Sequence, residues 1–227
     1  MHGEWHPALK ERSAGAEAEP MTSLRLLVLK ALRATYRAIA GSRAGAVLRH
    51  PAVERIRRRW VTVGASDVVE VLGILRAAGI EAWLAGGWGA DALLGVQTRK
   101  HGDLDLICAQ EEEAAALQAI RQAGFSFDYR ETVPTSPMSL RIVLRDTAGR
   151  TVDLHPVDLE AAPFCSPADA SAPETFASGT VGGLRVGCAS AALQVTLRQG
   201  YEVRRSDRRD VARLCADFGL ATPSAYE

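Results

Sequence analysis

The stretch GGWGADALLGVQTRKHGDLDLIC, residues 86–108, decides how the most polar part of the chain folds. It begins with a diglycine that follows the apolar run IEAWLA. The spacing predicts a short helix over 88–95, since the glycine at its end is a common helix terminator. A basic loop then leads into DLDLICA (103–109), where acidic and apolar residues alternate as in a half-buried strand. The local plan is therefore strand, diglycine, helix, basic loop and strand.

The diglycine, Gly86 and Gly87, lies where the expected strand turns into the helix. Because glycine has no Cβ atom, the turn can be tight and its N–H groups can approach a ligand closely. The first turn of the following helix adds positive partial charge, which favours phosphate. Gly-Gly pairs are also common as plain turns, so the pair points to phosphate only in combination with its neighbours.

Two acids follow on one face of the next strand. Asp103 and Asp105 are about 7 Å apart at Cα for a rise of ~3.3 Å per residue. Like charges on one face repel each other unless a cation lies between them, and Mg²⁺ is a typical partner of carboxylate oxygens. For this pair alone, the alternative is an edge strand whose charges prevent aggregation.

A third acid, Asp153, repeats the pattern in TVDLHPV (151–157), the expected second arm of a β-hairpin with 138–146. If this arm pairs beside 103–109, Asp153 lies about 4.8 Å from the acid pair. Three uncompensated acids are costly to bury, whereas two metal ions would neutralise them and serve phosphoryl transfer. The expected catalytic and metal-binding residues are Asp103, Asp105 and Asp153.

Cations in the preceding loop complement this group. Arg99 and Lys100 are candidate ligands of triphosphate oxygens, together with the diglycine. For Lys100, a solvated loop position is the open alternative. Arg141, on the first arm of the hairpin, has two open interpretations: a phosphate contact or a surface ion pair. Asp210, near the C-terminus, is expected to have a structural role.

The rest of the pattern predicts an α+β fold, with a small mixed sheet and helices largely on one side. The other expected elements are a helix over 67–79 capped by Ser66, a helix over 111–124, a strand over 125–130, one more strand or hairpin arm over 180–187, and helices over 190–200 and 206–218.

These motifs resemble the polymerase-β-type nucleotidyltransferase superfamily. More narrowly, WLAGGWGADALLGVQTRKHGDLDL with RIVLRDTAGRTVDLHPV is similar to the aminoglycoside 2''-adenylyltransferase and lincosamide nucleotidyltransferase group, over about residues 61–157. The resemblance implies a nucleotidyltransferase fold in which the diglycine holds the triphosphate. It also implies that Asp103 and Asp105 ligate two Mg²⁺ ions, and that Asp153 binds the catalytic metal or acts as the base on the acceptor hydroxyl.

The reaction implied by this resemblance is transfer of a nucleoside monophosphate, AMP from the co-substrate ATP, to a hydroxyl of an antibiotic-like small molecule. Pyrophosphate is the leaving group. Two alternatives stay open: modification of a protein or RNA acceptor, and an inactive binding or antitoxin module. The presence of all three acids argues against the inactive module. No stable nucleic acid partner is expected.

Charge divides the chain although it sums to zero. Residues 1–60 hold twelve Lys/Arg and five Asp/Glu, which leaves fifteen basic and twenty-two acidic residues for the remainder. The leader over 22–60 reads as basic and partly helical, a candidate for contact with an anionic membrane surface or RNA. The alternative is a helix pair packed against the body. The expected domains are this extension (1–60), the catalytic core (61–165) and a mainly helical acceptor-side region (166–227).

Composition excludes several other classes. Of the 227 residues, 47% are hydrophobic and 24% charged, which is ordinary for a globular protein with a core. No apolar run is long enough to span a membrane. The four cysteines form no C-x-x-C pair, so neither a zinc site nor a redox pair is indicated. Reduced cysteines and the absence of a signal-peptide core predict a cytoplasmic protein.

Overall fold

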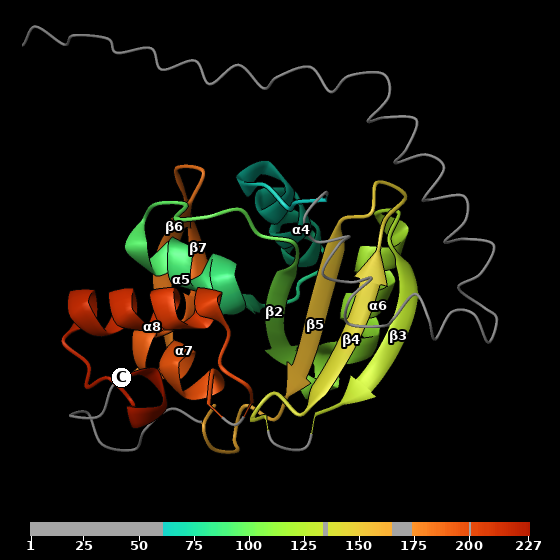
Figure 1. Ribbon diagram of the computed structural model, residues 1–227. Helices are drawn as coiled ribbons and strands as arrows, with labels where there is room; N and C mark the ends of the chain where they lie inside the picture. The colour runs from blue at the N-terminus through green and yellow to red at the C-terminus, as the bar shows by residue number, and fades with distance from the viewer. Residues whose placement is uncertain (1–60, 134–135, 165–173, 200) are drawn as a thin grey trace, which may run out of the picture.

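The computed structural model describes residues 61–133, 136–164, 174–199 and 201–227. These residues form one seven-stranded mixed sheet in the order β3-β4-β5-β2-β1-β7-β6 (Figure 1). The strands are β1 (Ala82–Leu84), β2 (Leu104–Ala109), β3 (Ser126–Thr132), β4 (Leu140–Arg145), β5 (Thr151–Val157), β6 (Phe176–Val181) and β7 (Leu184–Ala189). The helices are α4 (Ala65–Ala77), α5 (Gly86–Leu94), α6 (Glu113–Gln122), α7 (Ala191–Leu197) and α8 (Arg205–Phe218), with short 3₁₀ turns η1 (Gln110–Glu112) and η2 (Ser224–Tyr226).

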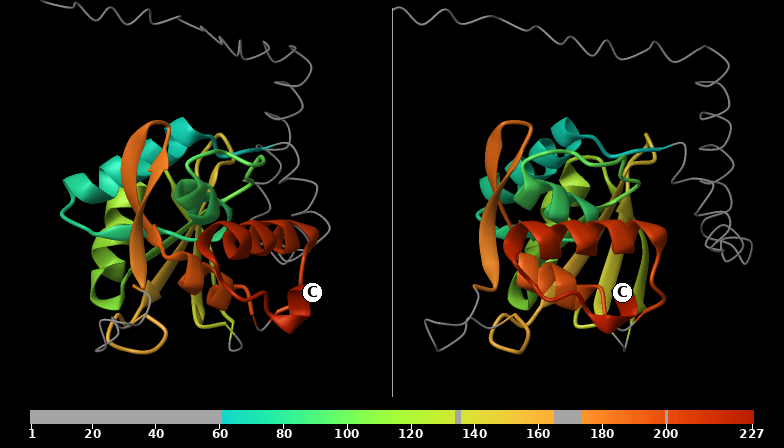
Figure 2. Two further views of the ribbon diagram at one scale, coloured as in Figure 1. Left: turned by 90° about the vertical axis from the view of Figure 1, so that its left-hand side faces the viewer. Right: turned by 60° about the vertical axis from the view of Figure 1, so that its left-hand side comes forward.

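Helices lie on both faces of the sheet. α4 and α6 lie behind it in Figure 1, and α7 and α8 lie in front of the end that holds β7 and β6. Figure 2 brings this end forward and shows α8 running alongside α5, with the β6–β7 hairpin at the margin of the molecule. None of the described helices covers the front of β3, β4 and β5 (Figure 1).

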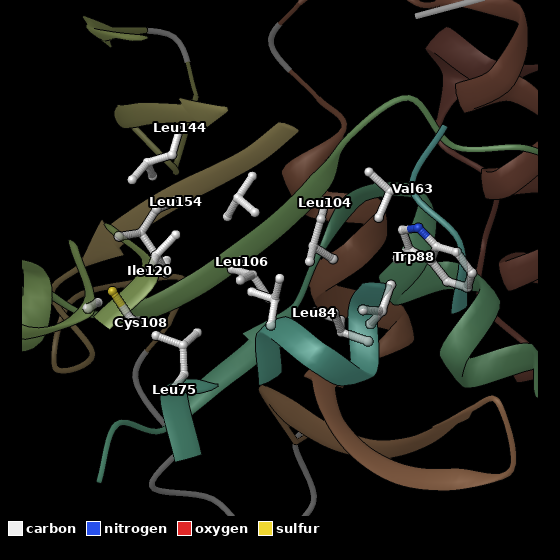
Figure 3. Packing of buried hydrophobic residues seen from close by; sticks show 14 of the residues in the cluster. Val63, Leu75, Leu84, Trp88, Leu104, Leu106, Cys108, Ile120, Leu144 and Leu154 are labelled. Atoms are coloured by element: carbon white, nitrogen blue, oxygen red, sulfur yellow. The ribbon is translucent and has the colours of Figure 1, made fainter. Parts of the chain in front are cut away.

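The main core lies between the sheet and α4 and α6. Leu104, Leu106 and Cys108 alternate along β2 and are all fully buried on this side. In Figure 3 they point into the same cluster as Leu154 of β5 and Leu84 of β1. The residues between them face the opposite side of the sheet because successive side chains of a strand alternate.

The structure confirms the predicted mixed sheet, the β3 strand, the β4–β5 hairpin and the two C-terminal helices. The sheet is larger than expected, because the predicted hairpin arm is a complete hairpin, β6–β7, whose β7 pairs with β1. The helices are not confined to one side, because α7 packs its own apolar cluster against the opposite face.

Two local predictions were wrong. The N-cap of α4 is Gly64 rather than Ser66, and the carboxylate of Asp67 accepts a hydrogen bond from the Gly64 N–H. The diglycine was expected to precede its helix, but it forms the first turn of α5. The helix does end at Gly95, as predicted.

The leader over 22–60 lies outside the described residues, and so does Cys165. The other three cysteines are buried and free, as small apolar residues would be, and burial raises the pKa of Cys108 to about 12. Among the described residues, no helix combines the length and the apolar character that crossing a membrane requires.

Candidate active site

Two of the three predicted acids lie side by side. β2 and β5 are parallel neighbours, and Asp105 is the register partner of Asp153. Residues in register on parallel strands point to the same face, so the two carboxylates share the face of the sheet opposite the leucine core. Asp103 immediately precedes β2, two residues before Asp105 and half-buried. The structure therefore brings Asp105 and Asp153 together and places Asp103 at the same end of the strand.

The apolar neighbours of the acids fix this register. Leu104 and Leu106 flank Asp105, Val152 and Leu154 flank Asp153, and all four are buried on the core side. A slip of one residue would turn the leucines to the opposite face of the sheet and the acids into the core. The pairing of two charged residues is thus enforced by hydrophobic burial on the other side of the same strands.

Arg141 of β4 completes a group that we call the acid face, defined by Asp105, Asp153 and Arg141. Its Nε and Nη2 atoms donate to Oδ2 of Asp153 at 3.0 and 2.5 Å. Its Nη1 donates to Glu131 of β3 at 2.6 Å. Burial alone would lower the pKa of Arg141, but the charges of Asp153 and Tyr129 and the hydrogen bonds to Asp153 and Glu131 together raise that pKa. Of the two interpretations left open for Arg141, the structure supports an ion pair.

The two oxygens of Asp153 are in different situations. The side chain is 1% exposed, and Oδ2 carries both hydrogen bonds from Arg141. Among the described residues, Oδ1 has no hydrogen-bond partner. His155 lies on the same strand, and its Nδ1 donates to the Leu140 carbonyl at 3.1 Å. Its Nε2 is 3.5 Å from Oδ1 of Asp105.

The diglycine packs directly against the acid face. Gly86 has a φ of +56°, which residues with a Cβ rarely adopt. A Cβ on Gly86 would also collide with Oδ2 of Asp105, and one on Gly87 would collide with His101 and Arg99. Both glycines are therefore required by close approach, and the start of α5 lies beside the acids as the sequence predicted.

Helices α7 and α8 hold this turn from the other side. Arg198 donates to the Gly86 carbonyl at 2.7 Å and to the backbone and side-chain oxygens of Gln194. Asp210 of α8 lies 3.5 Å from the same Arg198 guanidinium and is 5% exposed. We call Gly86, Gly87, Arg198 and Asp210 the diglycine corner. Sequence reasoning missed Arg198, whose only local signal is a basic residue directly after an apolar helix.

Arg99 connects the basic loop to this corner. Its Nη2 and Nε lie 3.0 and 3.4 Å from the carboxylate of Asp210. Burial would lower the pKa of Arg99, but its hydrogen bond with Asp210 raises it. The structural role expected for Asp210 is thus an ion pair with two arginines. Lys100 is exposed in the loop.

A buried pair of side chains fixes the position of this basic loop. Nε2 of His101 is 2.5 Å from Oδ2 of Asp91, and both side chains are 2% exposed. Thr98 donates to the same carboxylate through its hydroxyl and its N–H. Burial alone would raise the pKa of Asp91, but these hydrogen bonds and the His101 charge lower it overall. The loop between α5 and β2 is thereby fixed with Arg99 facing the diglycine.

The residues present are compatible with metal ions shared with a nucleotide. Within the described ranges, no three or more His, Cys, Asp and Glu side chains form a group that could hold a metal ion by themselves. Mg²⁺ is commonly held by one or two carboxylates plus substrate phosphates. Asp105 of β2 and Asp103, directly before the strand, offer such a partial ligand set.

A family model decides the assignment. The model described as aminoglycoside-2''-adenylyltransferase matches residues 67–214, well over half of the chain. The chain belongs to this family. The match confirms the resemblance inferred from the motifs and identifies this adenylyltransferase family member as a nucleotidyltransferase.

Individual proteins resemble this family member in sequence or in fold. A lincosamide resistance protein of Staphylococcus haemolyticus is 22% identical over 158 residues, which cover 67% of this chain and 94% of the relative. The structure of the lincosamide adenylyltransferase LnuA with lincomycin has a TM-score of 0.53 at 22% identity, covering 67% of this chain and 97% of that one. The crystal structure of ANT(2'')-Ia in complex with adenylyl-2''-tobramycin has a TM-score of 0.52 at 19% sequence identity. The match covers 68% of this chain and 89% of that one.

Proposed function

We propose that this protein transfers AMP from Mg-ATP to a hydroxyl group of a small antibiotic-like acceptor of the aminoglycoside or lincosamide class, with release of pyrophosphate. The observation that carries the proposal is the pairing of Asp105 with Asp153 in register, directly against the backbone of Gly86. A fold that only needed stability would not place two acids there, because their repulsion must be offset.

The diglycine corner is proposed to bind the triphosphate. The N–H groups at the start of α5 are free of intrahelical partners and carry positive partial charge. Arg99 lies against Gly87 and Lys100 is exposed in the same loop. Guanidinium and ammonium groups are suited to phosphate oxygens, so Gly86, Gly87, Arg99 and Lys100 are the proposed nucleotide-binding residues.

The acid face is proposed to perform the transfer. Asp153 takes the proton of the acceptor hydroxyl, the acceptor oxygen forms a bond to the α-phosphorus, and the bond to the pyrophosphate oxygen breaks. Asp103 and Asp105 are the residues that would hold two Mg²⁺ ions beside Asp153. When bound, the ions supply charge neutralisation on the phosphates during the displacement. Most of the remaining catalysis is positioning.

The acceptor is proposed to lie over the front of β4 and β5, next to α7 and α8. This is the side of the sheet on which Asp153 lies and which no described helix covers (Figure 1). The similar structures named above are a lincosamide adenylyltransferase bound to lincomycin and a protein in complex with adenylyl-2''-tobramycin. A small hydroxyl-bearing molecule of either class is therefore the first acceptor to test.

The test is a product assay with Mg-ATP and separate acceptors: lincomycin, tobramycin, a protein mixture and RNA. Pyrophosphate release is measured, and products are identified by mass spectrometry. The proposal predicts an adduct heavier by one AMP on lincomycin or tobramycin. If only protein or RNA is labelled, the proposed small-molecule acceptor is wrong and the macromolecule is the acceptor. Binding of Mg-ATP without any product would indicate an inactive module.

A further inference from the structure

We infer that Arg141 is a positioning residue for the transfer: it holds Asp153 by one oxygen, Oδ2, so that the orientation of the other oxygen, Oδ1, is fixed relative to Asp105. The inference rests on the proposed function and adds a residue and an atom to it. It comes from the one-sided hydrogen bonding of the Asp153 carboxylate.

The geometry of the contact is specific. Two donors of one guanidinium, Nε and Nη2, converge on the same Oδ2 atom at 3.0 and 2.5 Å. A planar guanidinium that donates twice fixes the direction of its partner as well as its distance. The Asp153 side chain therefore cannot rotate about its last bond without losing both hydrogen bonds.

Arg141 is itself held from the far side. Its third donor, Nη1, reaches Glu131 on β3 at 2.6 Å, and its guanidinium carbon lies 5.8 Å from the centre of the Tyr129 ring. β3, β4 and β5 are consecutive in the sheet. A row of hydrogen-bonded side chains, Glu131–Arg141–Asp153, thus crosses three strands on one face. It ends at Asp153, the register partner of Asp105.

The arrangement distinguishes the two oxygens chemically. Oδ2 already accepts two hydrogen bonds from the Arg141 guanidinium, so it is occupied. The opposite oxygen, Oδ1, is buried and has no hydrogen-bond partner among the described residues. A buried, unbonded carboxylate oxygen is costly to maintain for structure alone. Oδ1 is therefore the oxygen of Asp153 that remains for the reaction, and Arg141 determines which oxygen that is.

The experiment measures kcat and KM for AMP transfer from Mg-ATP to lincomycin or tobramycin, whichever the wild type modifies. Arg141→Gln is expected to lower kcat by ~10²-fold, the cost of a misplaced catalytic group, while KM for ATP changes by less than about 3-fold. Arg141→Lys is expected to retain more activity because it keeps the charge. Added guanidinium ion should restore Arg141→Ala at least in part.

Matched variants separate positioning from folding. Arg130→Gln removes an exposed arginine of β3 that pairs with Glu113, and its activity should be unchanged. In the Asp153→Asn background, Arg141→Gln should lower kcat little further, because the carboxylate that Arg141 positions is already absent. The melting temperature of each variant is recorded. If Arg141→Ala unfolds because Asp153 loses its compensating charge, Arg141→Lys is used in its place.

The outcomes distinguish the two levels of the proposal. If Asp153→Asn is inactive but folded Arg141→Gln and Arg141→Lys keep wild-type kcat, the positioning role of Arg141 is wrong and the proposed function stands. The same conclusion follows if the Arg141 and Asp153 effects multiply fully in the double variant. If Asp153→Asn itself stays active, the proposed function fails and the inference fails with it.

Discussion

The acid face and the diglycine corner are built in different ways. The acid face is set by strand register, since Asp105 and Asp153 pair across β2 and β5 while their apolar neighbours fill the core behind them. The corner is set by side chains that arrive from far along the chain. Arg198 reaches Gly86 across 112 positions, and Asp210 reaches Arg99 across 111.

This difference predicts different consequences of mutation. The acids lie on strands whose stability comes from leucines and valines on the other face, so a change from carboxylate to amide should remove chemistry and leave the fold intact. At the corner, backbone, helix starts and ion pairs interlock, so substitutions there should change stability and nucleotide affinity together. The predictions below test this contrast.

Removal of divalent metal is expected to have the largest effect. A chelator should lower AMP transfer by at least ~10³-fold, reversibly, because charge neutralisation by metal is worth several kcal/mol. Mg²⁺ alone should shift the melting temperature by less than about 1 °C, whereas Mg-ATP should raise it by several degrees. This follows because the described side chains hold no complete metal cage. A large shift with Mg²⁺ alone would contradict the shared site.

Gly86→Ala tests the corner most severely. The new Cβ would collide with Asp105, and the φ of +56° is unfavourable for alanine. The free energy of unfolding should fall by about 2–4 kcal/mol and kcat by ~10²-fold. The matched control is Gly73→Ala in α4, where a Cβ meets nothing within 4 Å. That change should stabilise by about 0.5–1 kcal/mol, measured by urea unfolding.

Asp210→Asn tests the link between the corner and the basic loop. Loss of the carboxylate frees Arg99 from its buried partner and weakens its orientation toward the triphosphate. KM for ATP should rise by about 10-fold, with kcat within about 3-fold, as expected for losing one charge-assisted contact. Asp217→Asn, at an exposed position of the same helix, is the control. Equal behaviour of the two variants would remove Asp210 from the nucleotide site.

Asp91→Asn gives the smallest effect and a pH signature. The folded pKa of Asp91 lies below its ordinary value of 3.8, so its ionised form stabilises the folded state above that pH. This contribution is lost as the pH falls through the folded pKa. The variant should be about 1–2 kcal/mol less stable near neutral pH, and the gap should narrow below about pH 4. A gap that is constant with pH would contradict the ionised pair.

The contrast also explains how far the sequence was informative. Alternation of acids and leucines, and a hairpin whose second arm repeats that pattern, are local signals, and they predicted that Asp105 and Asp153 would meet. The partners of the diglycine were not predictable in this way, because no periodicity connects Gly86 with Arg198. The orientation of Arg141 toward Asp153 was also undecided, since alternation places both residues on one face without saying which groups pair.

The central claim is that two neighbouring acids on β2 and β5 carry the reaction, and single-turnover AMP transfer from Mg-ATP to lincomycin or tobramycin tests it most directly. Asp105→Asn and Asp153→Asn are compared with the wild type, with circular dichroism and melting temperature confirming the fold. We predict that both variants fold and lose at least ~10³-fold in rate, with a lower melting temperature for Asp153→Asn because Arg141 loses its partner. Transfer at a near-wild-type rate by either folded variant would contradict the account.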